Sequence, residues 1–210
     1  MKGILLFGVT FCLIFTARAG EFMGTMKFVR YSNFDTSYYF VTIGKEDIRI
    51  DVADEHQKTI ETCIYDYIEN KGVMLSPEKR QYLTLSQPLF NNNNTDEDFS
   101  FVKTENYRII NNLKCYQWRV KNEKLSTEIE YWVTNFDFPL LSKLNNFDGK
   151  ANNLITFFRH IPDNDGYIPV ESIEYNLFRE IKDKLCLLEI IAKQPEASVF
   201  EIPSNYTKVL

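Results

Sequence analysis

Strict alternation of apolar and polar side chains is the feature that most restricts how this chain can fold. In the segment 47–52, three aliphatic residues alternate with aspartate, arginine and aspartate. A repeat of two residues is typical of a β-strand with one buried and one solvated face. The same alternation recurs in the segments 115–121, 128–134 and 173–178, so we predict strands there as well.

Further segments have the composition of strands, because Tyr, Phe, Ile, Val and Thr suit a pleated surface. They are 22–31, 38–43, 60–68, 73–75, 81–85, 101–110 and 185–193. Short links rich in Gly, Asn and Pro join most of them, which favours antiparallel pairing, since parallel pairing needs long crossovers. The exception is the Asn- and Asp-rich segment 87–98, which predicts a mobile surface loop.

Helical spacing is confined to the segment 139–161. Apolar residues recur there at Leu140, Leu141, Leu144, Phe147, Leu154, Phe157, Phe158 and Ile161. Pro139 suits a helix start and Pro162 a stop, so we expect about two short helices, each with one apolar face. Several strands, including 185–193, are apolar on both faces. We therefore predict a strongly curved antiparallel sheet, an open and incomplete barrel, with the helices packed on its concave face.

The N-terminus has the pattern of a cleavable secretory signal. Lys2 precedes an apolar stretch at 4–15, and Ala17 and Ala19 occupy the small-residue positions of a cleavage site. The stretch is too short to cross about 30 Å of hydrocarbon, and no later stretch approaches that length. We predict a signal peptide at 1–19, a single β-rich domain at 20–210, and a periplasmic location, with an extracellular one as the alternative.

Charge and motifs argue against several classes of function. The whole chain has a formal charge of −5, and removal of 1–19 would take away two more positive charges, so nucleic acid is not an expected partner. The two histidines are about a hundred positions apart and neither has a zinc-type neighbour. Nucleophile elbows, P-loops and dinucleotide fingerprints are missing from the sequence. We therefore predict a protein with neither metal nor cofactor and with no enzymatic activity.

Three cysteines follow the predicted signal, at positions 63, 115 and 186. Such an odd and sparse set is not a disulfide framework. In an oxidising compartment one bridge is possible, and Cys63 with Cys115 is the pair we consider. The alternative is that all three are small buried apolar residues.

The order of several short motifs resembles a family of exported Bacteroidota envelope proteins without known function. The matching segments are 24–28 (GTMKF), 47–51 (DIRID), 74–82 (MLSPEKRQY), 110–118 (INNLKCYQW), 130–134 (EYWVT) and 200–206 (FEIPSNY). Asn112 stands where that family usually has glycine, and the Asn-rich loop resembles an insertion. The chain is also distantly similar to periplasmic lipoprotein carriers of the LolA and LolB kind. This resemblance implies helices in the mouth of an unclosed barrel, whose cavity shields acyl chains.

The leading hypothesis is therefore a non-catalytic periplasmic protein that binds an apolar or lipid-like ligand, such as a lipid or lipoprotein, inside the curved sheet. Its expected ligand-binding residues are apolar and lie on alternating strand positions or on the helices: Phe28, Ile48, Ile50, Trp118, Ile129, Tyr131, Ile173, Tyr175, Leu144, Leu154, Phe157 and Phe158. The alternative is a structural or interaction protein of the cell envelope, with a core filled by its own helices and a protein partner. An enzyme that acts on envelope glycans or lipids is the third and least favoured reading.

Overall fold

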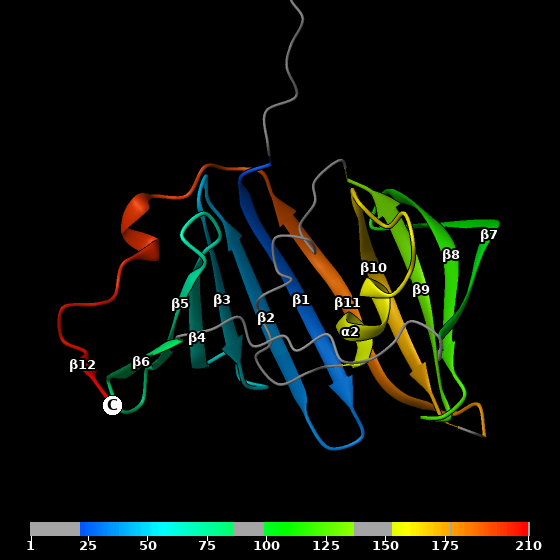
Figure 1. Ribbon diagram of the computed structural model, residues 1–210, viewed down its shortest axis with the longest axis horizontal. Coiled ribbons are helices and arrows are strands. Elements are labelled where there is room, and N and C mark those ends of the chain that lie inside the picture. The colour runs from blue at the N-terminus through cyan, green and yellow to red at the C-terminus, as the bar shows by residue number, and fades with distance from the viewer. Residues whose placement is uncertain (1–21, 86–98, 137–152, 177, 210) are drawn as a thin grey trace, which may run out of the picture.

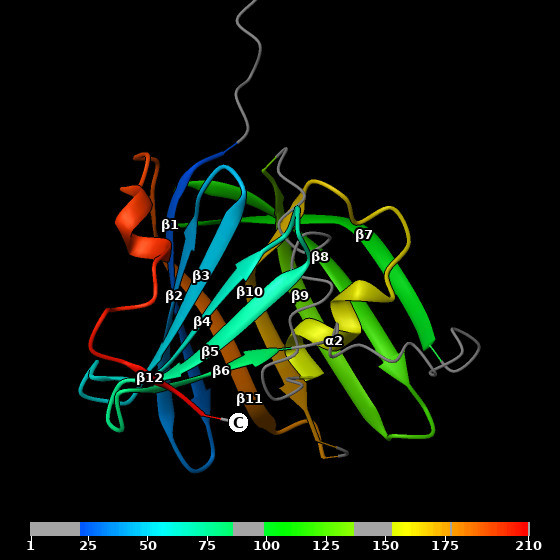
Figure 2. The ribbon, with the colours of Figure 1, turned by 60° about the vertical axis from the view of Figure 1, so that its left-hand side comes forward.

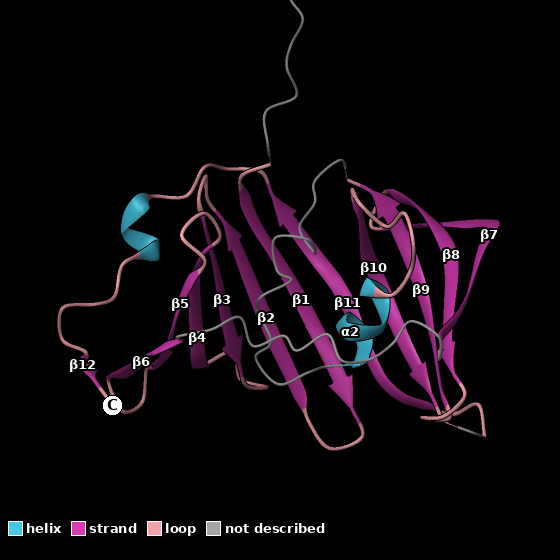
Figure 3. Cartoon of the chain, in the orientation of Figure 1, coloured by secondary structure: helices cyan, strands magenta, loops and turns pink. Residues whose placement is uncertain are grey.

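A computed structural model describes residues 22–85, 99–136, 153–176 and 178–209. Strands make up most of this part of the chain (Figure 3). In chain order the elements are β1 (Gly24–Ser32), β2 (Thr36–Ile43), β3 (Asp47–Ala53), β4 (Thr59–Asp66), β5 (Lys71–Ser76), β6 (Gln81–Leu85), β7 (Phe99–Ile110), β8 (Leu113–Asn122), β9 (Thr127–Asn135), α2 (Asn153–Arg159), β10 (Tyr167–Tyr175), β11 (Ile181–Ile191), η2 (Ala197–Phe200) and β12 (Thr207–Lys208).

The strands form one sheet with β1 in the middle (Figure 1). From β1 to β6 the strands follow in chain order toward one edge. Strand β7 forms the opposite edge, and β8 to β11 lead from there back to β1. Its order is β12-β6-β5-β4-β3-β2-β1-β11-β10-β9-β8-β7. Neighbouring strands pair antiparallel, except that β12 pairs parallel with β6. The sheet is curved (Figure 1). It does not close into a barrel, because β12 and β7 end this order without pairing to each other. This confirms the predicted mainly β class with one open, mostly antiparallel sheet.

The short links produce hairpins because their residues accept the backbone that tight turns need. Asn111 and Asn112 join β7 to β8, with φ values of 50° and 62°. A two-residue hairpin turn with positive φ at both positions matches the twist of the flanking strands, and asparagine tolerates that conformation better than most residues. Asn112 thus serves in the place where the resembling family has glycine.

The two faces of the sheet are covered by different parts of the chain (Figure 2). Helix α2 packs on the concave side, which we call the inner face. The helix η2 lies on the outer face, where Arg49 Nη1 donates to the Val199 carbonyl at 2.8 Å, and the chain then runs to β12 at the edge of the sheet. A Cβ at Gly44 would lie 2.8 Å from the Phe200 ring, so a larger residue there would require that ring to shift.

The tip of the β7–β8 hairpin also folds onto the outer face. The Arg108 guanidinium lies 4.0 Å from the ring centre of Trp132 and forms an ion pair with Glu171. The Asn111 side chain donates to the Leu187 carbonyl at 2.7 Å. Since β9 and β10 lie between β8 and β11 in the sheet, this tip crosses both strands and connects β8 with β11.

Two predictions about local structure need revision. The described residues contain one α-helix, α2, and not two, while the first predicted helix with Leu144 and the predicted loop 87–98 lie outside the described residues. The strand predicted at 173–178 is also misplaced, because β10 begins at Tyr167 and ends at Tyr175.

The structure has no bridge between Cys63 and Cys115, the pair considered as one possibility. Both residues are buried free thiols, one in β4 and the other in β8, and six strands lie between these two in the sheet. The cysteine count gave no information on topology, and the order of the strands places the two residues in opposite halves. Burial raises the pKa of the Cys63 thiol to about 12, as expected for an apolar packing residue.

Candidate functional site

The inner face of the sheet carries one apolar cluster to which both halves contribute. Nine of the twelve predicted ligand-binding residues belong to it, each no more than 9% exposed: Phe28, Ile48, Ile50, Trp118, Ile129, Tyr131, Leu154, Phe157 and Phe158. They come from β1, β3, β8, β9 and α2, so residues that are far apart in sequence share a single core. The alternation rule identified these strand faces because one face of each strand is buried.

Helix α2 fills the hollow with side chains at helical spacing. The Phe158 ring lies edge-on to Tyr131, with ring centres 5.1 Å apart, and stacks on Trp118 at 6.0 Å. Phe157 makes an edge contact with Phe99 at 5.0 Å. The helix ends at Arg159, shortly before Pro162, which cannot continue it. The helix is therefore held in the hollow by apolar contacts on one of its faces.

Ile173 and Tyr175 do not belong to this cluster. Ile173 lies opposite Glu130 and Lys184, on the face turned away from α2. Tyr175 lines a surface hollow of about 250 Å³ together with Lys121 and Arg179. Both apolar and polar residues occupy each face of β10, so alternation alone could not say which face turns inward.

The inward face of β10 is instead polar toward its end. Ser172, Glu174 and, on the neighbouring strand β11, Asp183 are 0%, 3% and 5% exposed. Glu174 and Asp183 lie directly opposite each other in the sheet, and Ser172 lies opposite Tyr131. We call Arg30, Tyr131, Ser172, Glu174 and Asp183 the polar row.

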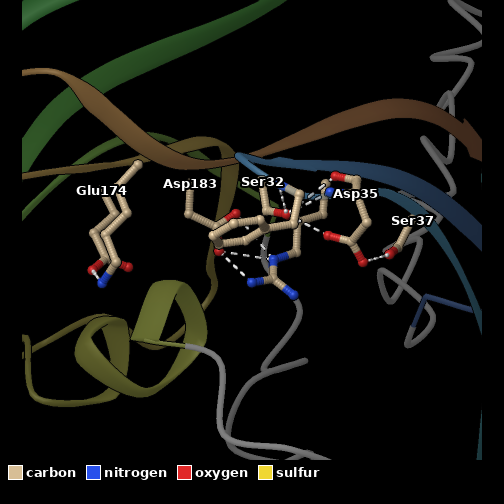
Figure 4. Close-up of polar contacts among 8 residues, drawn as sticks. Ser32, Asp35, Ser37, Glu174 and Asp183 are labelled. Atoms are coloured by element: carbon tan, nitrogen blue, oxygen red, sulfur yellow. Dashed lines mark hydrogen bonds and ion pairs between the residues drawn. The ribbon is translucent and has the colours of Figure 1, made fainter.

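Each carboxylate of the polar row has a cationic partner. Arg30 Nε donates to the Asp183 carboxylate at 2.8 and 3.0 Å, and Nη2 makes a further short contact with the same group. This bond to Asp183 raises the pKa of the guanidinium further above its usual value, and Tyr39 acts in the same direction. Lys182 Nζ donates to Glu174 Oε1 at 2.5 Å. Figure 4 shows Glu174 and Asp183 side by side above helix α2.

Two hydroxyls of the polar row differ from the carboxylates. Tyr131 Oη and Ser172 Oγ are buried, and neither has a hydrogen-bond partner within the described part of the chain. Burial raises the pKa of Tyr131 well above its usual value; the nearby Glu174 charge adds to this, whereas the Phe158 N–H acts in the opposite direction. Most buried polar groups in proteins are paired, so two unpaired hydroxyls on one face are unusual.

Sequence reasoning missed four members of the polar row, Arg30, Ser172, Glu174 and Asp183. Charged residues in alternating strands are normally assigned to the solvated face, because burial of an unpaired charge is costly. Arg30 and Asp183 are 153 positions apart, and no local pattern connects them. Only the pairing of β1 with β11 brings them together.

The described residues were also considered as metal ligands and as membrane-spanning helices. Within the described ranges no group of three His, Cys, Asp or Glu side chains is placed to hold a metal ion. His56 is exposed beside Glu55, and the His160 ring stacks on Phe99 at 3.9 Å. Among the described residues, no helix has the length and apolar character that a membrane span requires.

Comparisons with known proteins identify the fold. No family model and no curated protein matches the chain, so the resemblance to Bacteroidota envelope proteins stays a prediction. A conserved protein from Thermus thermophilus without known function matches in structure with a TM-score of 0.54 and 7% identity, over 89% of this chain and 90% of that one. MucB in complex with MucA(peri) matches at 0.52 and 8% identity, over 88% of this chain. A second MucA/MucB complex, from Pseudomonas aeruginosa, matches at 0.50 and 7%.

This chain spans 55% of the MucB chain in the first of these complexes, so it corresponds to about half of that protein. At such low identity the likeness concerns the backbone and carries no residue roles. The chain therefore has the open, curved, mainly antiparallel sheet found in the Thermus protein and in MucB.

Proposed function

We propose that this is a non-catalytic periplasmic protein that binds an apolar or lipid-like ligand on the inner face of its curved sheet. The observation that carries the proposal is the way α2 occupies that face. Leu154, Phe157 and Phe158 are almost fully buried in the hollow, yet they belong to a helix of seven residues. Helices this short are not stable alone in water, so α2 depends on its contacts with the sheet.

The energies allow an acyl chain to take the place of these side chains. Burying a Leu or Phe side chain gains about 1.5–3 kcal/mol, so the three together gain about 5–9 kcal/mol. An acyl chain gains about 0.8 kcal/mol per buried CH₂ group. About ten CH₂ groups therefore balance the contacts that α2 gives up, and a longer chain exceeds them.

The location rests on the predicted signal peptide at 1–19, which lies outside the described residues. Cleavage would release the domain at 20–210 into the periplasm of a bacterial envelope. There the same hollow would suit a lipid or the acyl chains of a lipoprotein, in the manner of the LolA and LolB carriers that the sequence resembles.

The two tryptophans offer a direct test with a matched control. Trp118 stacks on Phe158 of α2, whereas Trp132 lies on the outer face beneath Arg108. In mature protein carrying Trp132→Phe, titration with a neutral acylglycerol should change the Trp118 emission as the ligand displaces α2. In the Trp118→Phe variant, the emission of Trp132 should stay constant.

Mass spectrometry of an organic extract, made from protein purified from its native host, provides the second measurement. We expect a co-purified lipid at close to one equivalent. A protein that contains no lipid and whose Trp118 emission responds to no acyl ligand would refute the binding function.

One observation favours the alternative, an interaction protein of the envelope. Strand β7 is an edge of the sheet, and its exposed residues include Phe101, Val102 and Ile109, which are 45%, 52% and 63% exposed. An edge strand can accept a further strand from a partner. MucB is seen in complex with MucA(peri), so a neighbour of the same fold binds a protein. Retention of one envelope protein by the wild type, lost on Val102→Lys, would support this alternative.

A further inference from the structure

The two carboxylates of the polar row are each already paired with a cation. The pairs Arg30–Asp183 and Lys182–Glu174 each combine one positive and one negative group, so their charges cancel. The two carboxylates are 7% and 4% exposed as side chains. An ionised ligand group placed beside them would introduce a charge without a partner, and burying such a charge is very costly.

The hydroxyls that remain are neutral. Tyr131 Oη and Ser172 Oγ come from directly opposed positions of β9 and β10 and face the same side as α2. Each can donate one hydrogen bond, and within the described residues neither does so. A buried donor without an acceptor lowers stability unless a ligand or an ordered water supplies that acceptor.

We infer that the inner face recognises the uncharged oxygen of an acyl ester or amide, rather than the ionised carboxylate of a free fatty acid. The inference rests on the proposed binding function and specifies its ligand class. An ester or amide carbonyl accepts hydrogen bonds from Tyr131 and Ser172 without adding a charge. The acyl chain attached to that carbonyl then enters the space that the Phe158 ring occupies in the free protein, next to Tyr131 and Trp118.

The test compares two ligands that have the same chain and different head groups. Dissociation constants for monopalmitoylglycerol and palmitate are measured at pH 8 from Trp118 emission in the Trp132→Phe protein, below the concentrations at which either lipid forms micelles. We expect the ester to bind at least about tenfold more tightly, because palmitate must bring its charge beside Glu174 and Asp183.

Variants of the two hydroxyls test the recognition itself. Ser172→Ala and Tyr131→Phe should each weaken ester binding by about fivefold, the loss expected for one neutral hydrogen bond. Neither should change the weaker binding of palmitate. Ser204→Ala, at an exposed position between η2 and β12, is the matched control and should bind both ligands as the wild type does.

The possible outcomes separate the two proposals. If ester and acid bind equally, or if both hydroxyl variants bind the ester normally, the hydroxyls are satisfied by water and the ester preference is refuted, while lipid binding stands. If neither ligand changes the Trp118 emission of the Trp132→Phe protein, in which Tyr131 and Ser172 are unchanged, both the ester preference and the proposed function fail.

Discussion

Replacement of Tyr131 by phenylalanine should make the free protein more stable, although it removes a hydrogen-bonding group. The Tyr131 hydroxyl is fully buried without a partner among the described residues. Leaving a polar group unsatisfied in the interior costs about 1–3 kcal/mol. Phenylalanine keeps the edge contact with Phe158, and the proximity of the Phe158 N–H recovers part of that cost in the wild type. We therefore expect a gain of about 1 kcal/mol in the free energy of unfolding.

Urea denaturation at pH 7, followed by circular dichroism, measures this difference when the transition is two-state. Tyr31→Phe is the control, because Tyr31 is 48% exposed and its hydroxyl remains in contact with water. This control should change stability by less than about 0.5 kcal/mol. A loss of about 1 kcal/mol or more in Tyr131→Phe would show that the hydroxyl is well bonded in the folded protein, and the reasoning about the polar row would be refuted.

The same pair of proteins should diverge at alkaline pH. Burial raises the pKa of Tyr131 in the folded state, so the stability linked to this group is fully present below the unfolded pKa of about 10. As the pH rises further, the unfolded chain releases the proton while the folded protein keeps it. The wild type should then lose about 1.4 kcal/mol per pH unit relative to Tyr131→Phe, up to the pKa of the folded state. Parallel stability curves between about pH 10 and 11 would contradict this.

Three further predictions concern the packing around the site. Asp183→Asn should lower the free energy of unfolding by about 2 kcal/mol, which lies between the values for exposed and buried ion pairs because Arg30 keeps partial access to water. Lys71→Ala removes an exposed ion pair and is the control. Equal thermal unfolding midpoints for the two variants would disprove the prediction. Gly24→Ala should lower the free energy of unfolding, measured by urea denaturation, by about 1–3 kcal/mol. The added Cβ would lie 2.2 Å from the Ile191 carbonyl oxygen and push β1 away from β11. An unchanged free energy of unfolding would mean that the two strands shift freely. Cys63 should react with iodoacetamide at pH 8 at least about a hundredfold more slowly in the folded protein than in urea, because burial raises its pKa to about 12. Mass spectrometry measures the two rates. Equal rates would show that β4 opens readily.

Local patterns were sufficient to predict most of the strands and the apolar part of the site. Side chains in a strand alternate with a period of two, so a segment such as 47–52 reveals both its structure and its buried face. The spacing of Leu154, Phe157 and Phe158 likewise predicted a helix with one apolar face, which α2 confirms. Nine of the twelve residues predicted from periodicity to bind a ligand therefore lie in one buried cluster, and ligand binding by them stays a prediction.

The orientation of β10 and the existence of the polar row were decided only by tertiary structure. A strand with apolar and polar residues on both faces satisfies alternation in either orientation, and the pairing with β9 and β11 selects the one that turns Ser172 and Glu174 inward. Burial of Asp183 is tolerated because Arg30 arrives from a strand 153 positions away. Sequence alone specified the periodic burial of apolar side chains, since that depends on local backbone geometry, whereas the partners of buried polar groups depend on which distant strands become neighbours.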